Sequence, residues 1–443
     1  MTLRHSATRR SFLKQLTLAG LATPWITRDL LALPPETILR HASFGTAGMA
    51  GSDISALTSN KFVKLVAAAD VDTHRSAELK KRFPEVRIYR DWRELLDKEQ
   101  NNIDSVNVST PDHMHAPIGM SAMQLGKHVY GQKPLAHEIY EVRQMTRVAQ
   151  QKGLVTQMGI QIHSEREYRL AVQLVQDGVI GKIKEVHSWS NKKWGDPNPR
   201  PAWSDPPPAS LNWDLWLGVV SERPFIGENY YHPANWRKRL DFGTGTFGDM
   251  GCHIYDPVFK ALELTAPISL RSEGPTPNAF NWANNATIHY LFPGTKFTEG
   301  KTVKVTWYDG DRRPSQDVQT LLEGDRLPEQ GSIFVGTNGV LLLPHVAKPQ
   351  LYPDSQFKNF AFPKLPPQNH WTQFAEACCG NGKTSAGFEY SGPLTETVLL
   401  GGVATRFPKT DLEWDASNLK FNLAEASQLL RRKYRKGWEV AEL

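Results

Sequence analysis

Three polar residues in the second half of the chain have a spacing that suits proton transfer. Asp249, His253 and Asp256 are separated by four and three residues, so on a helix they would share one face. An imidazole with a carboxylate one turn away on either side is held in orientation and has its pKa raised, as a general base for a hydroxyl proton requires. The alternative is a helix N-cap followed by a buried histidine, and spacing alone does not decide between the two.

A lysine in the first half is a second candidate. Lys133 directly precedes Pro134, just after a predicted strand at 128–130. Ligands of open α/β sheets bind outside the carboxyl ends of strands, so a cation at this position would face a ligand. From spacing alone, a solvated surface lysine is the better interpretation.

A third group of polar residues follows the predicted strand 105–108. Ser109, Thr110 and Pro111 come first, and two histidines, His113 and His115, follow within four residues. The strand-end rule predicts that this group faces the same ligand. We do not predict a metal site, because no further ligand has suggestive spacing and a short turn before a helix favours polar caps.

A small-residue turn precedes these groups. Residues 45–51 include Gly45, Ala47 and Gly48 between a predicted strand and a predicted helix, which lets backbone amides approach a pyrophosphate. The pattern is degenerate, and alone it would fit any strand-to-helix turn. Asp70 stands 25 residues after Gly45, where an acid that binds a ribose diol is expected. With Val71 and no arginine directly after it, the acid favours NAD over NADP.

The elements that position these residues alternate between short apolar runs and amphipathic stretches, which predicts a parallel sheet flanked by helices. The second half predicts an antiparallel sheet and a return to helices. The predicted strands of the first half are 38–44, 62–69, 105–108, 128–130 and 155–160, and its helices are 76–83, 115–125 and 136–151. The predicted strands of the second half are 268–272, 286–292, 303–307, 332–335 and 340–343, and its helices are 371–379, 395–406 and 423–434.

Tryptophan is concentrated where the second half begins. Six of the 13 tryptophans lie within 48 residues, and an indole offers a flat apolar face with one polar handle that suits a sugar ring. Core packing uses tryptophan equally well, so the sequence favours neither a carbohydrate platform nor a structural role for the cluster. Its members are Trp189, Trp194, Trp203, Trp213, Trp216 and Trp236.

Composition narrows the classes of function. The 443 residues suffice for two domains, and the three cysteines offer no framework of spaced pairs. The formal charge of +6 is concentrated at the chain ends, and taking nine terminal cations away leaves −3 on the rest, so no nucleic-acid surface is predicted. The nine are Arg4, Arg9, Arg10, Lys14, Arg431, Arg432, Lys433, Arg435 and Lys436.

The N-terminus has the sequence pattern of an export signal. Arg9 and Arg10 precede Phe12, Leu13 and Lys14 and then a weakly apolar stretch, the pattern of a twin-arginine signal that exports folded proteins. The apolar stretch is too short to span a bilayer, so no stable membrane span is predicted. The expected location is the periplasm or another site outside the cytoplasm, with the export machinery as a partner.

Taken together, these motifs resemble the Gfo/Idh/MocA oxidoreductases, the family of glucose-fructose oxidoreductase and inositol dehydrogenase, over about residues 38–434. The similarity rests on the degenerate turn, on 69–72, 109–115, 126–129 and 133–134, and on 212–218 and 248–253. It looks closest to an exported twin-arginine subgroup that carries Trp236 and Arg237 ahead of the glycine-rich run.

The resemblance implies an α/β Rossmann domain followed by an α+β domain with a large open, mostly antiparallel sheet that often forms homo-oligomers. We therefore expect a signal and linker at 1–35, an NAD(P)-binding domain at 36–160 and a substrate domain at 161–443. The resemblance also reverses the interpretation of Lys133, because it implies that Lys133, Asp249 and His253 are the catalytic residues. The substrate residues it implies are Trp236, Arg237, Asp249 and His253. The cofactor residues are Gly45, Ala47, Gly48, Met49, Asp70, Ser109, Thr110, Pro111, His113, Lys133 and Gln161.

One position departs from the family pattern, because Gln132 stands where many members have a glutamate before Lys-Pro. The resemblance implies an exported NAD(P)-dependent oxidoreductase acting on a secondary hydroxyl of a sugar, polyol or derivative. The alternative is a glycosidase, lyase or epimerase that oxidises the sugar transiently without net redox. Outside the cytoplasm no soluble pool reoxidises the cofactor, so we expect NAD to be held tightly and recycled.

Overall fold

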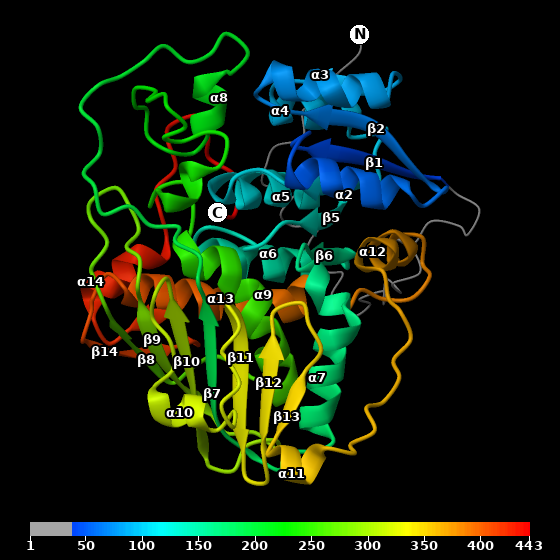
Figure 1. Cartoon of the computed structure of the whole chain (residues 1–443). Helices are drawn as coiled ribbons and strands as arrows, with labels where there is room; N and C mark the ends of the chain where they lie inside the picture. Colours follow the sequence, from blue (N-terminus) through cyan, green and yellow to red (C-terminus); the bar gives the residue numbers. More distant parts are fainter. Residues whose placement is uncertain (1–37) are drawn as a thin grey trace, which may run out of the picture.

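Two β-sheets organise the chain, one in each half (Figure 1). The computed structural model describes residues 38–443, so the predicted twin-arginine signal lies outside the described residues. The first half forms the upper part of the molecule, and the second sheet lies below it, with helices between the two (Figure 1). Among the described residues, no helix is both long and apolar enough to span a membrane.

The first sheet has six parallel strands in the order β3-β2-β1-β4-β5-β6, the doubly wound arrangement that the sequence predicts. Its strands are β1 (Leu39–Phe44), β2 (Val63–Ala69), β3 (Arg87–Tyr89), β4 (Ser105–Val108), β5 (His128–Gly131) and β6 (Thr156–Met158). Its helices are α2 (Met49–Thr58), α3 (Thr73–Arg82), α4 (Trp92–Glu99), α5 (His115–Gln124) and α6 (Ile139–Gln151), with a short 3-10 turn at Asp112–Met114. The sequence did not predict β3 and α4.

The second sheet has nine strands in the order β13-β12-β11-β7-β10-β9-β8-β14-β15, and only β7 and β10 pair in parallel. The prediction of a large, mostly antiparallel sheet is therefore confirmed. Its strands are β7 (Ile183–Ser190), β8 (Ser269–Glu273), β9 (Thr287–Pro293), β10 (Thr302–Asp309), β11 (Gln330–Gly336), β12 (Val340–Pro344), β13 (Gln350–Tyr352), β14 (Asp411–Asp415) and β15 (Lys420–Phe421).

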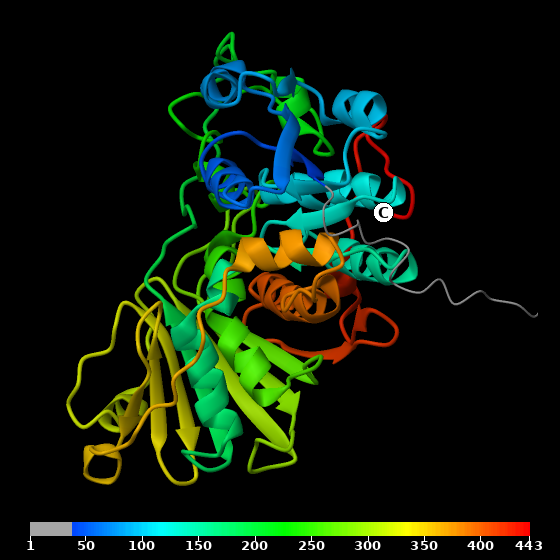
Figure 2. The same ribbon diagram turned by 90° about the vertical axis from the view of Figure 1, so that its right-hand side faces the viewer.

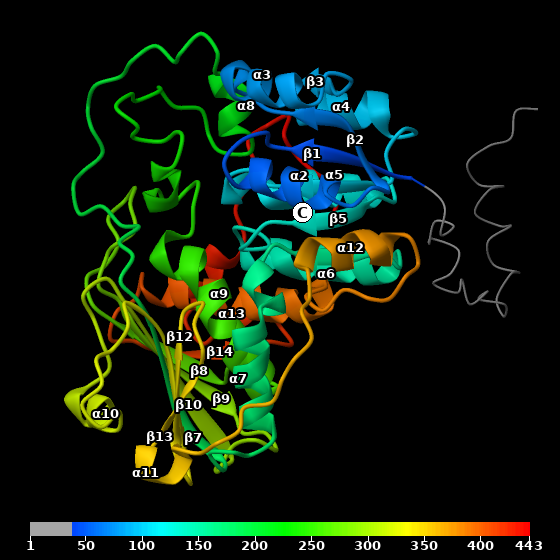
Figure 3. The same ribbon diagram turned by 45° about the vertical axis from the view of Figure 1, so that its right-hand side comes forward.

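Helices α9 and α13 fill the space between the sheets, and α12 packs against α2 of the first half (Figures 2 and 3). Because α13 packs against α6 and α9 packs against β7, one continuous core joins both halves. These helices are α7 (Arg166–Gln176), α8 (Trp213–Leu217), α9 (Gly245–Leu262), α10 (Gln316–Thr320), α11 (Asp354–Phe357), α12 (His370–Cys378), α13 (Phe388–Ala404) and α14 (Ala424–Ser427), with 3-10 turns at Gln161–Ser164, Asn235–Lys238 and Gln428–Leu430.

The predicted helix at 423–434 is wrong. Only α14 and a short 3-10 turn form, and the chain leaves the helical path after Leu430. Tertiary contacts are the cause. Arg432 donates a hydrogen bond to Glu138, and the Tyr434 hydroxyl donates one to Glu141 at 2.6 Å. Both acids belong to the first half, so the C-terminal segment serves as a tie between the halves.

Candidate active site

A cavity of about 530 Å³ lies where the carboxyl ends of β1, β4 and β5 meet the start of α9. Both halves contribute to its walls. Of the sequence-predicted residues, those that line it are Gly45, Ala47, Gly48, Met49, Asp70, Ser109, Thr110, Pro111, Lys133, Gln161, Trp236, Arg237, Asp249 and His253.

The small-residue turn after β1 is shaped by a close backbone approach. Gly45 has φ +97°, and a Cβ there would lie 2.6 Å from the carbonyl oxygen of Ser109. Gly48, with φ +59°, caps α2 without a side-chain hydrogen bond, and no acid stands in the first turn of this helix. The amides at the start of α2 are therefore suited to an anionic group.

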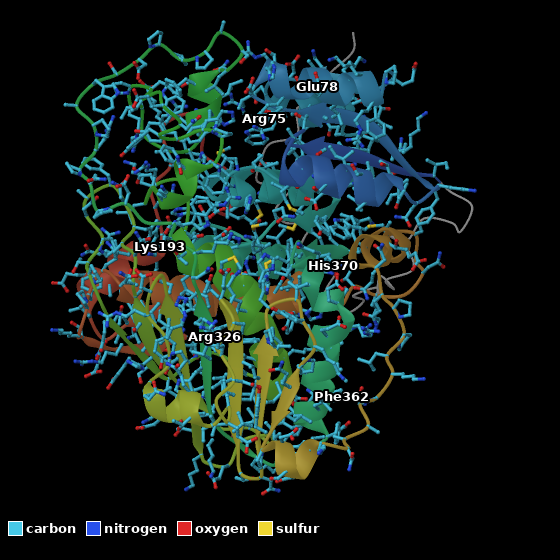
Figure 4. All side chains as sticks on the ribbon, viewed as in Figure 1. Arg75, Glu78, Lys193, Arg326, Phe362 and His370 are labelled. Atoms are coloured by element: carbon cyan, nitrogen blue, oxygen red, sulfur yellow. The ribbon has the colours of Figure 1, made fainter. Side chains whose placement is uncertain are left out.

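Asp70 ends β2 at the same edge, as predicted. Its carboxylate accepts hydrogen bonds from the amide and hydroxyl of Thr46, at 3.0 and 2.7 Å, and from the amide of Asp72 at 3.0 Å. These bonds fix the acid against the turn. Arg75, on α3, also lines this end of the cavity, and Figure 4 labels it on the side of α3 that faces α8.

His113 does not reach the cavity, contrary to its prediction as a cofactor residue. The side chain is fully buried, its Nε2 lies 3.0 Å from the carbonyl oxygen of Trp216, and its ring packs edge-on against Phe242. Burial lowers its pKa well below the usual range. The side chain points away from the strand end because the short 3-10 turn rotates it into the core between the two halves.

An ion-pair cluster forms the opposite end of the cavity. Lys133 Nζ donates to Asp249 Oδ1 at 2.8 Å and to the Asp249 carbonyl oxygen at 2.7 Å. Arg237 Nε donates to Oδ1 at 3.2 Å, and Trp194 Nε1 donates to Oδ2 at 2.8 Å. Burial opposes ionisation of Asp249, but Lys133 and Arg237 outweigh it and hold its pKa well below the usual range. Lys133 is thus a paired, largely buried cation and not a surface lysine.

His253 lies one turn further along α9 and lines the same cavity. Its Nδ1 is buried and has no hydrogen-bond partner in the described part of the chain, so Nε2 is the ring nitrogen open to the cavity. The predicted rise in its pKa is wrong: burial, and next the charge of Lys133, lower the pKa well below the usual range. A neutral imidazole results, which is free to accept a proton at neutral pH although it is a weaker base than an ordinary histidine.

Asp256 shares the helix with His253 but serves another group. It lies 2.8 Å from Nδ1 of His163 and accepts from the Tyr390 hydroxyl at 2.6 Å. It therefore orients a buried cluster behind the site, and the predicted triad of two carboxylates around one imidazole does not form. The spacing on one helix was correct, but the partners on other elements decided the contacts.

The glycines before α9 permit a close approach of another chain segment. A Cβ on Gly243 would lie 2.5 Å from the Cα of Arg237. This packing brings Trp236 and Arg237, on a 3-10 turn, against the cavity, and the Arg237 guanidinium lies 4.2 Å from the centre of the Trp236 ring. The glycines therefore admit a segment of the protein itself here.

The tryptophan cluster divides between the two predicted roles. Trp194, Trp216 and Trp236 contribute to the active site, and Trp216 also stacks on Trp213 at 4.8 Å. Trp189 is fully buried, on the face of the second sheet that α10 covers. The structural interpretation is confirmed for Trp189, and the carbohydrate platform stays a prediction for the tryptophans at the active site.

The residue before Lys133 joins a second buried network. Gln132 Nε2 donates to Asp53 Oδ2 at 3.0 Å, Ser109 donates to the same oxygen at 2.7 Å, and Trp371 Nε1 donates to Oδ1 at 2.9 Å. Burial raises the pKa of Asp53 to about 6 against the effect of these three donors. The amide of Gln132 therefore faces a carboxylate, where a second carboxylate would be repelled.

Sequence reasoning missed Asp53 and several residues that connect the halves. Asp112 accepts from the amide and hydroxyl of Thr244, which caps α9, at 3.1 and 2.7 Å. His232 reaches Asp72 at 3.3 Å and lines the cavity. No group of metal-ligating residues occurs in the described part of the chain. No local signal pairs residues so far apart in sequence.

Comparison with protein families decides the relationship. Residues 39–160 match the NAD-binding Rossmann fold of the oxidoreductase family Gfo/Idh/MocA, and residues 185–440 match its C-terminal alpha/beta domain. The chain belongs to the Gfo/Idh/MocA family.

Curated relatives match only in part. Levoglucosan dehydrogenase of Pseudarthrobacter phenanthrenivorans is 29% identical over 42% of this chain and 40% of its own length. Glycosyl hydrolase family 109 protein 1 of Shewanella sp. is 27% identical over 40% of this chain and 45% of its own. The chain thus spans less than half the length of these relatives. The crystal structure of WlbA dehydrogenase from Bordetella pertussis, in complex with NADH and UDP-GlcNAcA, has a similar fold: TM-score 0.60, 13% identity, 86% of this chain and 98% of WlbA.

Proposed function

We propose that this protein is an NAD-dependent oxidoreductase that acts on a secondary hydroxyl of a sugar, polyol or derivative. One observation carries the proposal: Lys133 Nζ and His253 stand together where the nucleotide-binding half meets α9, with Asp249 bonded to the lysine. A fixed cation and a neutral imidazole in one cavity are the two groups that removal of a hydride and a proton from an alcohol requires.

The residues of the cavity fit a nicotinamide nucleotide. A Cβ would fill the turn at Gly45, the start of α2 is uncapped, and the Thr110 hydroxyl is buried without a partner in the described structure. The turn and the first amides of α2 would hold the pyrophosphate, and Asp70 would hold a ribose. When bound, the nicotinamide supplies the hydride acceptor.

The protein's own groups then handle the proton and the charge. His253 Nε2 takes the hydroxyl proton, because its low pKa leaves it unprotonated at neutral pH. Lys133 stabilises the negative charge that develops on the substrate oxygen. Asp249 keeps the lysine in position through two contacts, one from its side chain and one from its carbonyl oxygen.

The preference for NAD over NADP rests on Asp70, whose carboxylate would repel a 2′-phosphate. Arg75 lines the same end of the cavity and offers the opposite charge. We expect the ratio of NADP to NAD dissociation constants to fall when Asp70 is changed to Asn, because the repulsion is removed. Titration of both nucleotides measures the ratio, and a wild-type ratio below one would contradict the proposal.

An alternative within the same site is transient oxidation. The oxidised sugar has an acidic neighbouring C–H, and elimination or epimerisation followed by return of the hydride gives lyase, epimerase or glycosidase chemistry without net redox. The relatives named as a dehydrogenase and as a glycosyl hydrolase support the two alternatives respectively.

One experiment separates the two. Holoprotein is incubated with sugars and glycosides in deuterated water, while the absorbance of reduced nicotinamide and the mass of the products are followed. The oxidoreductase accumulates reduced cofactor, or alternates between two substrates, without deuterium on carbon. The alternative incorporates deuterium next to the oxidised carbon and accumulates no reduced cofactor. If a broad panel of sugars gives neither reduced cofactor nor deuterium on carbon, both proposed activities are contradicted.

We further propose export by the twin-arginine route, supported by Arg9 and Arg10 in the sequence. The cofactor would then be held tightly and restored within each cycle, because no soluble pool reaches it. Changing both arginines to lysine should retain the protein in the cytoplasm, whereas Lys14→Arg should not. Export of the double-lysine variant at the wild-type level would contradict the proposed route.

We also propose a homo-oligomer that uses the second sheet. The face opposite α9 carries Trp189 and Ile333, which are fully buried beneath α10 and its neighbours, and Tyr308 and Val335 pack against them only partly buried. Light scattering of the purified protein tests this, and a monomer at micromolar concentration would contradict it.

A further inference from the structure

A second cavity, of about 390 Å³, lies beside the start of α9 and shares no lining residue with the cofactor cavity. Its walls come from the first turn of α9, from α13, from the loop between β5 and α6, and from the C-terminal segment 428–433. The proposed reaction uses none of these walls.

The two acids that line this cavity are already neutralised. Arg432 Nε donates to Glu138 at 2.7 Å and lies almost wholly among protein groups. Arg223 forms an ion pair with Asp241 at 2.7 Å, and Arg432 also donates to the Asp241 carbonyl oxygen. Each carboxylate therefore has an arginine of its own, and both also attract Arg406 without forming an ion pair with it.

Of the other cations in the lining, Arg431 donates to the Leu443 carbonyl oxygen at 2.8 Å, which leaves Arg406 and Lys433. Arg406 follows the end of α13 and is partly buried, and within residues 38–443 its guanidinium forms neither a hydrogen bond nor an ion pair. Lys433 stands exposed in the same lining and is likewise unpaired within those residues. Because desolvating an arginine without a partner is costly, an anion bound here would recover free energy that the protein alone leaves unused.

One wall of the cavity is apolar. Val398, Leu399 and Val403 present one face of α13, and the Trp282 ring lies against Gly402, with its N–H already donated to the Gly243 carbonyl oxygen. We propose that this cavity is a second binding site, for a small organic anion. The anionic group of such a ligand contacts Arg406 and Lys433, and its flat or apolar body lies on Trp282 and α13.

Anilinonaphthalene sulfonate, a flat apolar anion whose fluorescence rises in such sites, is the probe. The full-length protein is titrated with it, and the dissociation constant is compared between variants. Arg406→Gln and Lys433→Gln should each weaken binding about tenfold, the loss of one charge-assisted contact. Arg75→Gln, in the cofactor cavity, is the matched control and should leave this binding unchanged.

Unchanged affinity in Lys433→Gln, an exposed change that should not disturb folding, together with unchanged affinity in Arg406→Gln would overturn the site. So would the absence of any bound dye, or binding that only Arg75→Gln weakens, because the dye would then occupy the cofactor cavity. If Arg406→Gln does not fold, Lys433→Gln alone decides. The test needs no nucleotide and no substrate, so its outcome is independent of the proposed function.

Discussion

The two ends of the cofactor cavity are built in different ways. The nucleotide end consists of backbone amides, small residues and strand ends that lie close together in sequence, from Gly45 to Asp70 and at Ser109–Pro111. The reactive end is assembled from side chains on separate segments, with Lys133, Trp194 and Arg237 converging on Asp249. Backbone geometry creates the first end, and balanced charge creates the second.

Two buried carboxylates show what the difference means. Asp53, behind the nucleotide end, is met only by neutral donors, and burial raises its pKa to about 6. Asp249 is largely buried, but two cations keep its pKa low and its charge intact. Burial without a cation therefore brings the pKa of one acid close to the physiological range, whereas the cations keep the other acid ionised and paired with Lys133.

The largest effect is expected from Lys133→Met. Loss of the cation removes both the stabilisation of the substrate oxygen and the partner of Asp249, so turnover should fall by roughly a thousandfold or more. Nucleotide affinity should stay within about twofold, because the nucleotide end is built separately. Steady-state kinetics and nucleotide titration measure the two quantities. Lys152→Met, on the surface of the first half, is the control, and near-normal turnover of Lys133→Met would remove the lysine from the mechanism.

His253→Ala should lower turnover by about a hundredfold or more while nucleotide stays bound. The low pKa of the imidazole predicts that wild-type kcat does not decline between pH 8 and about pH 6 through protonation of this residue. The pH profile of kcat checks this. A decline centred near the ordinary histidine pKa would show that the base is protonated more easily than its burial and Lys133 allow.

Asp53→Asn tests whether the buried Asp53, which has no cation beside it, makes the free energy of unfolding depend on pH. The pKa of Asp53 is raised in the folded protein, so the folded state binds more protons and its stability falls as pH rises from about 4 to about 6. Relative to the Asn variant, the wild type should lose about 3 kcal/mol of unfolding free energy over this range. Denaturant unfolding at several pH values measures it. Asp317→Asn, on exposed α10, is the control, and parallel pH curves for wild type and Asp53→Asn would contradict the assignment.

Gly45→Ala should disturb the nucleotide end with the smallest effect of the four. The new Cβ would meet the Ser109 carbonyl oxygen, and φ +97° strains any side chain, so about 1–3 kcal/mol of nucleotide binding or stability should be lost. Gly126→Ala has a similar positive φ with open space around it and serves as the matched control. Equal nucleotide affinity in both variants would show that the turn at Gly45 does not contact the ligand.

The residues expected at the nucleotide end, apart from His113, line one cavity for a physical reason. The turn, Asp70 and the strand-end residues depend on local backbone geometry and on the rule that ligands lie at carboxyl ends of strands. His113 was wrong because one short 3-10 turn, which pattern does not reveal, directs it into the core. The short strand β3 escaped prediction because three residues carry too little periodicity.

For the reactive end, the sequence allowed us to predict which residues take part but not which of them contact one another. Asp249 and His253 were recognised from their spacing, and Lys133 only through the family resemblance. Which carboxylate would meet which partner depended on Lys133 arriving from the first half and on His163 and Tyr390 arriving behind α9. The pKa of His253 followed from that assembly, so the sequence indicated the wrong direction.

Nucleotide binding tests the central claim most directly. The purified protein is denatured, the released material is analysed by absorbance and mass, and protein freed of nucleotide is titrated with NAD. We predict about one nicotinamide nucleotide per chain, carried through purification or bound on titration, with Lys133→Met like wild type and Gly45→Ala weaker. No released nucleotide and no binding of NAD or NADP on titration would contradict the account.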